Sequence, residues 1–210
     1  MKKLVVIITI LILFIPKVNA STSSASSYIL MDSTTGRVLM SKDMHSKRLI
    51  ASITKIMTAT LAIESGKLND VVEVSPIIKE AYGSGIYIEV GEEITLKDLV
   101  YGLMLRSGND AAMMISEYIG GTTEEFVNMM NNKAKEIGMK ETTFYNPSGL
   151  PTPSGNYSSV YDMALLTKYA MNSPVYQEIV KTKTYKVTTN KKTYLWRNKN
   201  KLLKYDYITG

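Results

Sequence analysis

Two short apolar stretches near the N-terminus, residues 28–31 and 37–40, flank a polar turn at residues 32–36 that ends in glycine. This order of residues predicts a β-hairpin. A second pair of stretches, 184–189 and 193–197, alternates between polar and apolar residues around a three-residue polar turn. The alternation predicts another hairpin near the other end of the chain.

Apolar residues between the two hairpins recur at spacings of three and four, which is the period of a helix with one buried face. Proline and glycine are frequent in residues 146–156, which predicts a long loop. A helix-rich middle with strands near both ends predicts an α+β fold, with a helical subdomain and an antiparallel sheet. The expected helices are 52–67, 95–105, 110–119, 122–138 and 159–171.

The first twenty residues have the features of a secretory signal. Two lysines precede an apolar run at residues 4–15, and small residues follow before Ser21. We expect cleavage near Ala20, export from the cytoplasm, a serine-rich linker at 21–27 and one catalytic domain at 28–210. A retained N-terminal anchor is the alternative, although the run is shorter than the ~20 residues that span a bilayer.

Composition narrows the chemistry that remains open. The 210 residues are 45% hydrophobic and 21% charged, which excludes a wholly disordered or collagen-like chain. There is no cysteine and one histidine, so thiolate nucleophiles, disulfides, cysteine metal sites and two-histidine mechanisms are excluded. Serine chemistry with a lysine base remains open, and no cofactor is expected.

The formal net charge is +6, and nine of the 25 basic residues fall between positions 181 and 204. A nucleic-acid ligand conflicts with the predicted export and is not expected. The basic cluster is interpreted either as a solvated face or as a surface with affinity for an anionic cell-wall polymer or a membrane surface.

The segment Ser52-Ile-Thr-Lys55 is the first candidate for catalysis. Residues three apart share a helical face, with Cβ atoms about 5–6 Å apart, so the lysine amine can reach the serine hydroxyl. A desolvated lysine loses part of its preference for the charged form and can accept the serine proton. The spacing therefore indicates a serine nucleophile with a lysine base.

A second candidate is Ser107-Gly-Asn109, on a turn between two apolar helices. A serine there can relay protons, and the asparagine amide can hold a substrate carbonyl. A similar sequence at 154–156 is interpreted as loop structure. His45 lies among polar residues and is interpreted as a surface residue. The methionine pairs 113–114 and 129–130 are interpreted as core packing.

With these motifs in this order, the chain resembles the low-molecular-weight penicillin-binding proteins, in particular the serine-type D-alanyl-D-alanine carboxypeptidases. The resemblance implies a β-lactamase/transpeptidase-like fold, with Ser52 as the acylated nucleophile and Lys55 as its base. Ser107 would relay protons and Asn109 would bind the substrate amide. The implied reaction removes the terminal D-alanine from a peptidoglycan stem peptide, and β-lactams would acylate the same serine. The segments that carry the resemblance are 27–39, 50–58, 90–112, 134–139 and 144–150.

One departure from the family pattern concerns its third motif, Lys-Thr-Gly. The chain has Ile208-Thr-Gly210 near the place where that motif is expected. We therefore expect a partial domain without the last strands of the sheet, poorly stable and weakly active, since the substrate carboxylate would lack a cationic partner. Two alternatives stay open: a non-catalytic exported chain that binds the cell wall, and a β-lactamase-type hydrolase.

Overall fold

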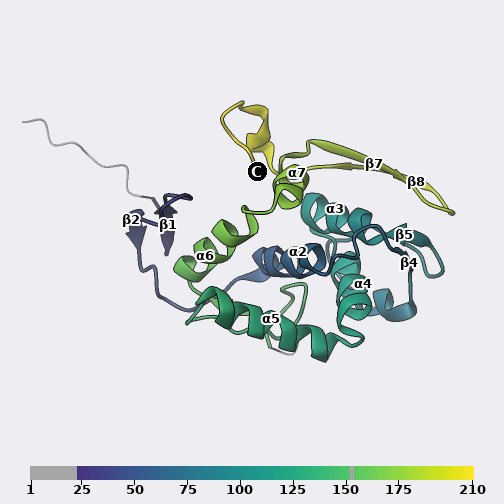
Figure 1. Cartoon of the computed structure of the whole chain (residues 1–210), viewed down its shortest axis with the longest axis horizontal. Helices are drawn as coiled ribbons and strands as arrows, with labels where there is room; N and C mark the ends of the chain where they lie inside the picture. The colour runs from purple at the N-terminus through teal and green to yellow at the C-terminus, as the bar shows by residue number, and fades with distance from the viewer. Residues whose placement is uncertain (1–22, 152–153) are drawn as a thin grey trace, which may run out of the picture.

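The computed structural model describes residues 23–151 and 154–210. The predicted signal segment at 1–20 and the first two linker residues lie outside this range. Within this range five α-helices, α3 to α7, surround a central one, α2, with the two hairpins at opposite ends of the body (Figure 1). Among the described residues, no helix has the length and apolar character needed to cross a membrane. The helices are α2 (Lys55–Glu64), α3 (Leu96–Arg106), α4 (Asn109–Gly120), α5 (Thr123–Ile137), α6 (Val160–Ala170) and α7 (Pro174–Lys181).

The strands pair two by two in antiparallel fashion. The α+β prediction and both predicted hairpins are confirmed, although the strands of the described residues form four separate pairs instead of one sheet. The pairs are β1 (Tyr28–Met31) with β2 (Val38–Lys42), β3 (Arg48–Leu49) with β6 (Tyr157–Ser158), β4 (Val71–Glu73) with β5 (Glu93–Thr95), and β7 (Thr184–Thr188) with β8 (Thr193–Arg197).

Helix boundaries follow the capping residues in the sequence. Thr95, Thr122 and Ser159 each accept a hydrogen bond from the backbone N–H three residues on, which satisfies a donor that the first helical turn leaves open. Gly138 ends α5 in the left-handed conformation. The α3, α4, α5 and α6 predictions therefore agree with the structure to within one or two residues, whereas α7 and the pairs β3–β6 and β4–β5 were not predicted.

The predicted helix 52–67 needs a correction. Residues Ala51–Thr54 form a 3₁₀ turn, η1, and the α-helix runs only from Lys55 to Glu64. Two further 3₁₀ turns, η2 (Pro76–Glu80) and η3 (Lys201–Lys204), were not predicted. A 3₁₀ turn has three residues and an α-helical turn has 3.6, so both place residues three apart on one side, and the apolar pattern did not separate η1 from α2.

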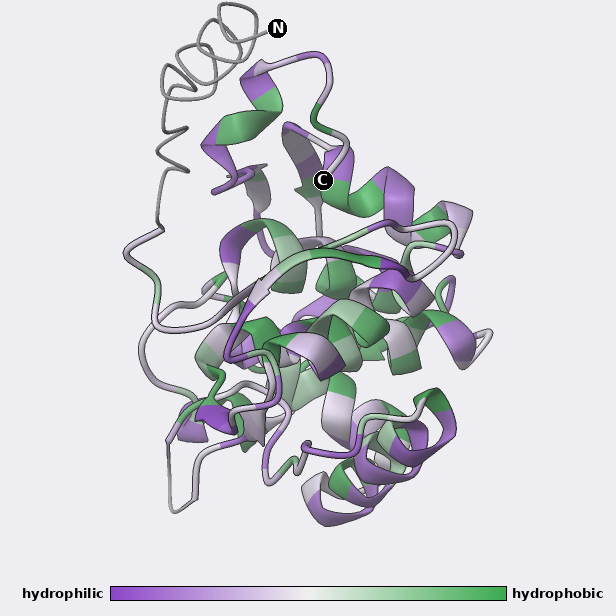
Figure 2. Ribbon diagram, turned by 90° about the vertical axis from the view of Figure 1, so that its left-hand side faces the viewer, coloured by the Kyte–Doolittle hydropathy of each residue, from purple (hydrophilic) through white to green (hydrophobic). Residues whose placement is uncertain are grey.

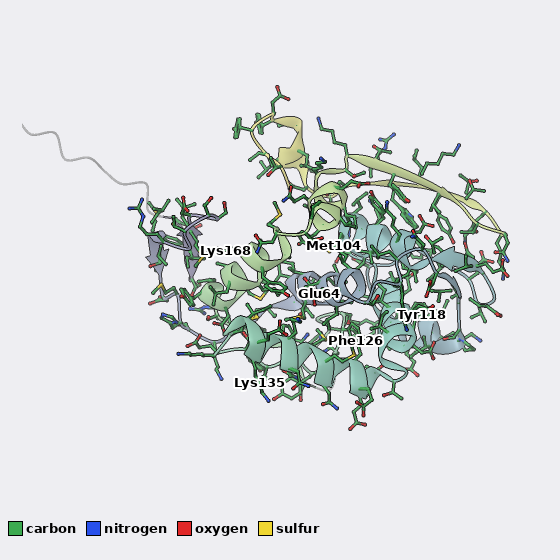
Figure 3. All side chains as sticks on the ribbon, viewed as in Figure 1. Glu64, Met104, Tyr118, Phe126, Lys135 and Lys168 are labelled. Atoms are coloured by element: carbon green, nitrogen blue, oxygen red, sulfur yellow. The ribbon has the colours of Figure 1, made fainter. Side chains whose placement is uncertain are left out.

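The hydrophobic core surrounds α2, whose small side chains let neighbouring helices approach closely. Met57, Ala59 and Ala62 are completely buried, as is Phe126 from α5. Hydrophobic residues are concentrated in the interior helices (Figure 2). Phe126 lies on the inner side of α5 (Figure 3). A rigid, densely packed α2 gives the residue at its first position, Lys55, a fixed place.

Only one residue of each methionine pair is buried in the core. Met114 and Met130 are buried, whereas Met113 is half-buried and Met129 is 37% exposed. Consecutive helical residues point about 100° apart, so only one of each pair can face the core. The prediction that both members of each pair fill the core was wrong for Met129.

Candidate active site

Ser52 and Lys55 lie together at the start of α2. The 3₁₀ geometry of η1 stacks residues three apart directly above one another, and Lys55 Nζ lies 3.3 Å from Ser52 Oγ. Ala51, just before the serine, has a φ of 43°, which is unusual for a residue other than glycine. The serine side of this pair is exposed, so a substrate can reach the hydroxyl.

The Lys55 amine is buried and fully engaged. Besides Ser52, it donates to Asn109 Oδ1 at 2.7 Å and to the Ser148 carbonyl at 2.6 Å. Burial lowers the Lys55 pKa to about 8, helped by the nearby Lys199 charge and opposed by Asp110. A substantial fraction of the amine is therefore neutral slightly above physiological pH, as a general base requires.

Ser107 and Asn109 occupy the junction between α3 and α4. Ser107 ends α3 in the left-handed conformation (φ 61°), and Asn109 opens α4. The Asn109 amide donates to the Tyr82 carbonyl at 2.6 Å while its oxygen accepts from Lys55. An asparagine amide has a second N–H and a second lone pair, so Asn109 retains capacity for a further partner.

Ser52, Lys55 and Ser107 line one cavity of about 350 Å³. Its walls come from η1, α2, α3, α6 and α7 and from the segment after β8, and Met104 of α3, labelled in Figure 3, is one of the lining residues. The structure thus brings three of the four predicted site residues to one cavity, with Asn109 bonded to Lys55 behind it. The other lining residues are Ile53, Ile56, Leu103, Met104, Thr167, Tyr176, Val180, Asn198, Asn200 and Gly210.

The loop 146–156 contributes contacts that the sequence did not reveal. Gly149 has a φ of +85°, and a Cβ there would lie 1.9 Å from the Ala51 carbonyl oxygen. Asn156 is buried and donates to Thr54 Oγ1 at 2.9 Å, so it ties the loop to η1. Ser154, the other polar residue of that second Ser-Gly-Asn sequence, is exposed. The loop therefore holds η1, and with it the serine–lysine pair, through the close backbone approach at Gly149 and the side-chain bond from Asn156.

A second loop, 82–88, packs against the Ser107–Asn109 junction. Asp110 accepts hydrogen bonds from the backbone N–H groups of Ile86 and Tyr87. The Asn109 N–H donates to the Ser84 carbonyl, and Lys199 Nζ lies 3.3 Å from Ser84 Oγ. These bonds hold the loop in place beside the cavity.

His45 lies away from this site. It is exposed and its Nδ1 lies 3.6 Å from Glu141 Oε1, with the ring against Tyr161. The interpretation of His45 as a surface residue is confirmed. Over residues 23–151 and 154–210, no group of three or more histidine, aspartate or glutamate side chains is placed to hold a metal ion.

Solved structures with the same arrangement of elements define the class of this protein. A penicillin-binding protein homolog from Mycobacterium tuberculosis superposes with a TM-score of 0.86 at 28% identity, covering 90% of this chain and 72% of that one. A variant of the Streptomyces K15 DD-transpeptidase gives a TM-score of 0.85 at 29% identity, covering 90% and 80%. The fold is that of penicillin-binding proteins and transpeptidases.

Sequence comparison gives the family. The Peptidase S11 model, described as D-alanyl-D-alanine carboxypeptidase, matches residues 16–210. The D-alanyl-D-alanine carboxypeptidase DacF of Bacillus subtilis is 43% identical over 191 residues, which covers 86% of this chain and 48% of the relative. This chain belongs to the Peptidase S11 family. It spans about half the length of DacF and of the Escherichia coli relative DacC.

Proposed function

We propose that this chain acts on peptidoglycan as a serine-type D-alanyl-D-alanine carboxypeptidase, outside the cytoplasm. The observation that carries the proposal is the buried Lys55 amine 3.3 Å from the exposed Ser52 hydroxyl, with its pKa lowered to about 8. Membership of the S11 family supports the substrate class.

In the proposed reaction, neutral Lys55 accepts the proton of Ser52 as Oγ attacks the carbonyl carbon of the penultimate D-alanine. The C–N bond to the terminal D-alanine then breaks, and the leaving amine takes up a proton through Ser107. Water hydrolyses the Ser52 ester and frees the enzyme. Asn109 would orient the substrate amide with its remaining N–H, while its oxygen keeps Lys55 in position. β-Lactams would acylate Ser52 by the same attack.

The Ser52→Ala variant tests the proposal. We expect the parent chain to be labelled by a fluorescent penicillin and to release D-alanine only slowly from a pentapeptide ending in D-Ala-D-Ala, because Ile208 and not a lysine precedes Thr209 and Gly210 and the substrate carboxylate lacks a cationic partner. Ser52→Ala should lose both activities, because the nucleophilic oxygen is gone, while mass spectrometry of the labelled parent should place the adduct on Ser52.

Ser154→Ala is the matched control, since Ser154 is an exposed loop serine in the second Ser-Gly-Asn sequence. It should label like the parent. Equal labelling of Ser52→Ala and the parent would show that another residue is acylated. A parent that neither labels nor releases D-alanine would refute the enzymatic proposal for this chain.

A further inference from the structure

Charge is strongly segregated along this chain. Residues 181–210 contain nine lysine or arginine residues and one acidic residue, whereas residues 23–180 contain 13 basic and 18 acidic residues. The last thirty residues therefore carry a net charge of +8 on a body of −5. Of the nine basic residues, only Lys192 forms an ion pair with an acidic side chain within the described part of the chain. The remaining charge is available to a partner.

The β7–β8 hairpin and the residues just before it display part of this charge at exposed positions. The hairpin runs along one edge of the molecule beside α3 (Figure 1). The inner side chain of Tyr185 stacks on Tyr101 of α3. The outward positions of both strands are all exposed. Lys186 pairs across the ladder with Leu195, and Arg197 with Thr184. Exposed Lys181 and Lys183 lie just before β7.

We propose that Lys181, Lys183, Lys186 and Arg197, the basic face, bind a phosphodiester polymer of the cell wall. This inference rests on the proposed cell-wall function. A five-residue strand extends about 17 Å. Lys186 and Arg197 on the two strands, together with Lys181 and Lys183 before β7, therefore offer four exposed cations to a chain with repeated negative charges. Simultaneous contacts of this kind reinforce one another without a shaped pocket.

The chemistry of the face favours a polymer over a lipid surface. The outer side of the hairpin carries threonine, lysine and arginine, with Leu195 as its one large apolar residue. Insertion into a bilayer interface needs a broader apolar or aromatic face. Exposed Tyr205 and Tyr207 lie in the segment after η3 and are not part of the hairpin.

The basic face borders the candidate active site. Asn198, which directly follows Arg197, lines the cavity that contains Ser52. Binding of a wall polymer to the hairpin would therefore hold the cavity next to the wall and raise the local concentration of stem peptides around Ser52.

The test uses sedimentation of the purified chain with bacterial cell walls, either intact or stripped of phosphodiester polymers by hydrofluoric acid. We expect binding to intact walls, at least about tenfold weaker binding to stripped walls, and weakening by salt because exposed charges are screened. The variant K181E/K183E/K186E should lose binding by at least the same factor, and the neutral K181Q/K183Q/K186Q by less. Labelling by fluorescent penicillin, measured in parallel, should persist in both variants if the proposed function is right.

The control variant K79E/K135E/K140E changes the net charge equally at exposed lysines elsewhere; Lys135, for example, lies on the outer side of α5 (Figure 3). It should bind walls like the parent. Equal binding to stripped and intact walls, equal losses in the control and the hairpin variants, or stronger binding to anionic lipid vesicles than to walls at equal phosphate would each overturn the proposal. So would the absence of binding to intact walls.

Discussion

Two features of the surroundings of Lys55 have opposite effects on the pKa of its amine. Its three hydrogen-bond acceptors favour the charged form, whereas burial favours the neutral form. The effect of burial is the larger one, since the pKa of Lys55 falls to about 8. The residue is therefore poised as a base under mildly alkaline conditions, whereas an exposed lysine titrates at 10.5.

This pKa predicts the pH dependence of acylation. The rate constant for fluorescent-penicillin labelling should rise about tenfold per pH unit well below the Lys55 pKa and level off above about pH 8, because the neutral fraction follows the titration. Stopped-flow or quenched time courses across this range measure it. A flat profile would mean that Lys55 is not the base.

Replacement of Lys199 tests the pKa of Lys55 more directly. The charge of Lys199 lowers the Lys55 pKa, so Lys199→Gln should shift the labelling profile to higher pH, by less than about one unit since solvent and salt screen the pair. Lys201→Gln, at an exposed lysine two residues further on, is the control and should leave the profile in place. A shift to lower pH would contradict the assignment.

Asp162 is another buried ionisable residue, and it is not among the residues that line the cavity. Its Oδ2 accepts from the Glu141 N–H and from Thr142 Oγ1, whereas Oδ1 has no hydrogen-bond partner among the described residues. Burial raises the pKa of Asp162, and the adjacent Glu141 carboxylate, itself beside His45, adds to the increase. The folded chain therefore binds a proton more tightly here than the unfolded chain does.

Replacement of Asp162 tests this effect on stability. A raised folded-state pKa means that the stabilisation is complete at low pH and is lost as pH rises through that pKa. Asp162→Asn keeps an oxygen acceptor without the charge, so its melting temperature at neutral pH should equal or exceed that of the parent and vary less with pH. Thermal melts by circular dichroism across the acid range measure this; a melting temperature well below the parent's at neutral pH would refute it.

Among the elements, the loop 146–156 has the tightest link to the site. Its Gly149 backbone approaches η1 so closely that the Ala51 carbonyl oxygen would overlap a Cβ atom. Ser148, one residue earlier, supplies a carbonyl to Lys55. The loop and η1 therefore fit together only with glycine at this position.

Gly149→Ala should consequently lower both stability and labelling. We expect a loss of more than about 2 kcal/mol in the free energy of unfolding, since steric overlap adds to the cost of a left-handed alanine. Gly66→Ala is the control, because Gly66 has a similar φ of +73° but open space around it, and should cost about 1 kcal/mol. Equal losses in urea unfolding of the two variants would show that the contact with Ala51 does not matter.

At the scale of the whole molecule, the β1–β2 hairpin exposes apolar side chains next to unpaired strand edges. Leu39 and Met40 are 52% and 53% exposed, and the hairpin pairs with no other strand among the described residues. An apolar groove of about 540 Å³ separates it from α6. Exposed apolar strands with open edges promote association between copies.

We therefore expect concentration-dependent self-association of the purified chain, reduced by the double change L39K/M40K. Light scattering over a concentration series measures it. Leu195→Lys, which removes one exposed leucine from the other hairpin, should have a smaller effect. Identical light scattering from the parent and the double variant would show that the chain does not self-associate through this hairpin.

The sequence determined the features that depend on near neighbours. The helix ends predicted at Thr95, Thr122, Gly138 and Ser159 lie within a residue of those in the structure, because the cap that ends a helix acts within one helical turn. The contact between Ser52 and Lys55 could also be predicted from the sequence, since residues three apart lie on the same side of a helical turn.

Tertiary structure alone decided whether that pair could do chemistry. Lys55 receives its acceptors from Asn109 and Ser148, which are 54 and 93 residues away, and loses its water to helices packed around α2. No local pattern encodes these contacts, because a pKa depends on every group that surrounds the amine after folding. The sequence placed a serine beside a lysine, and long-range packing lowered the pKa of that lysine, on which its proposed role as a base depends.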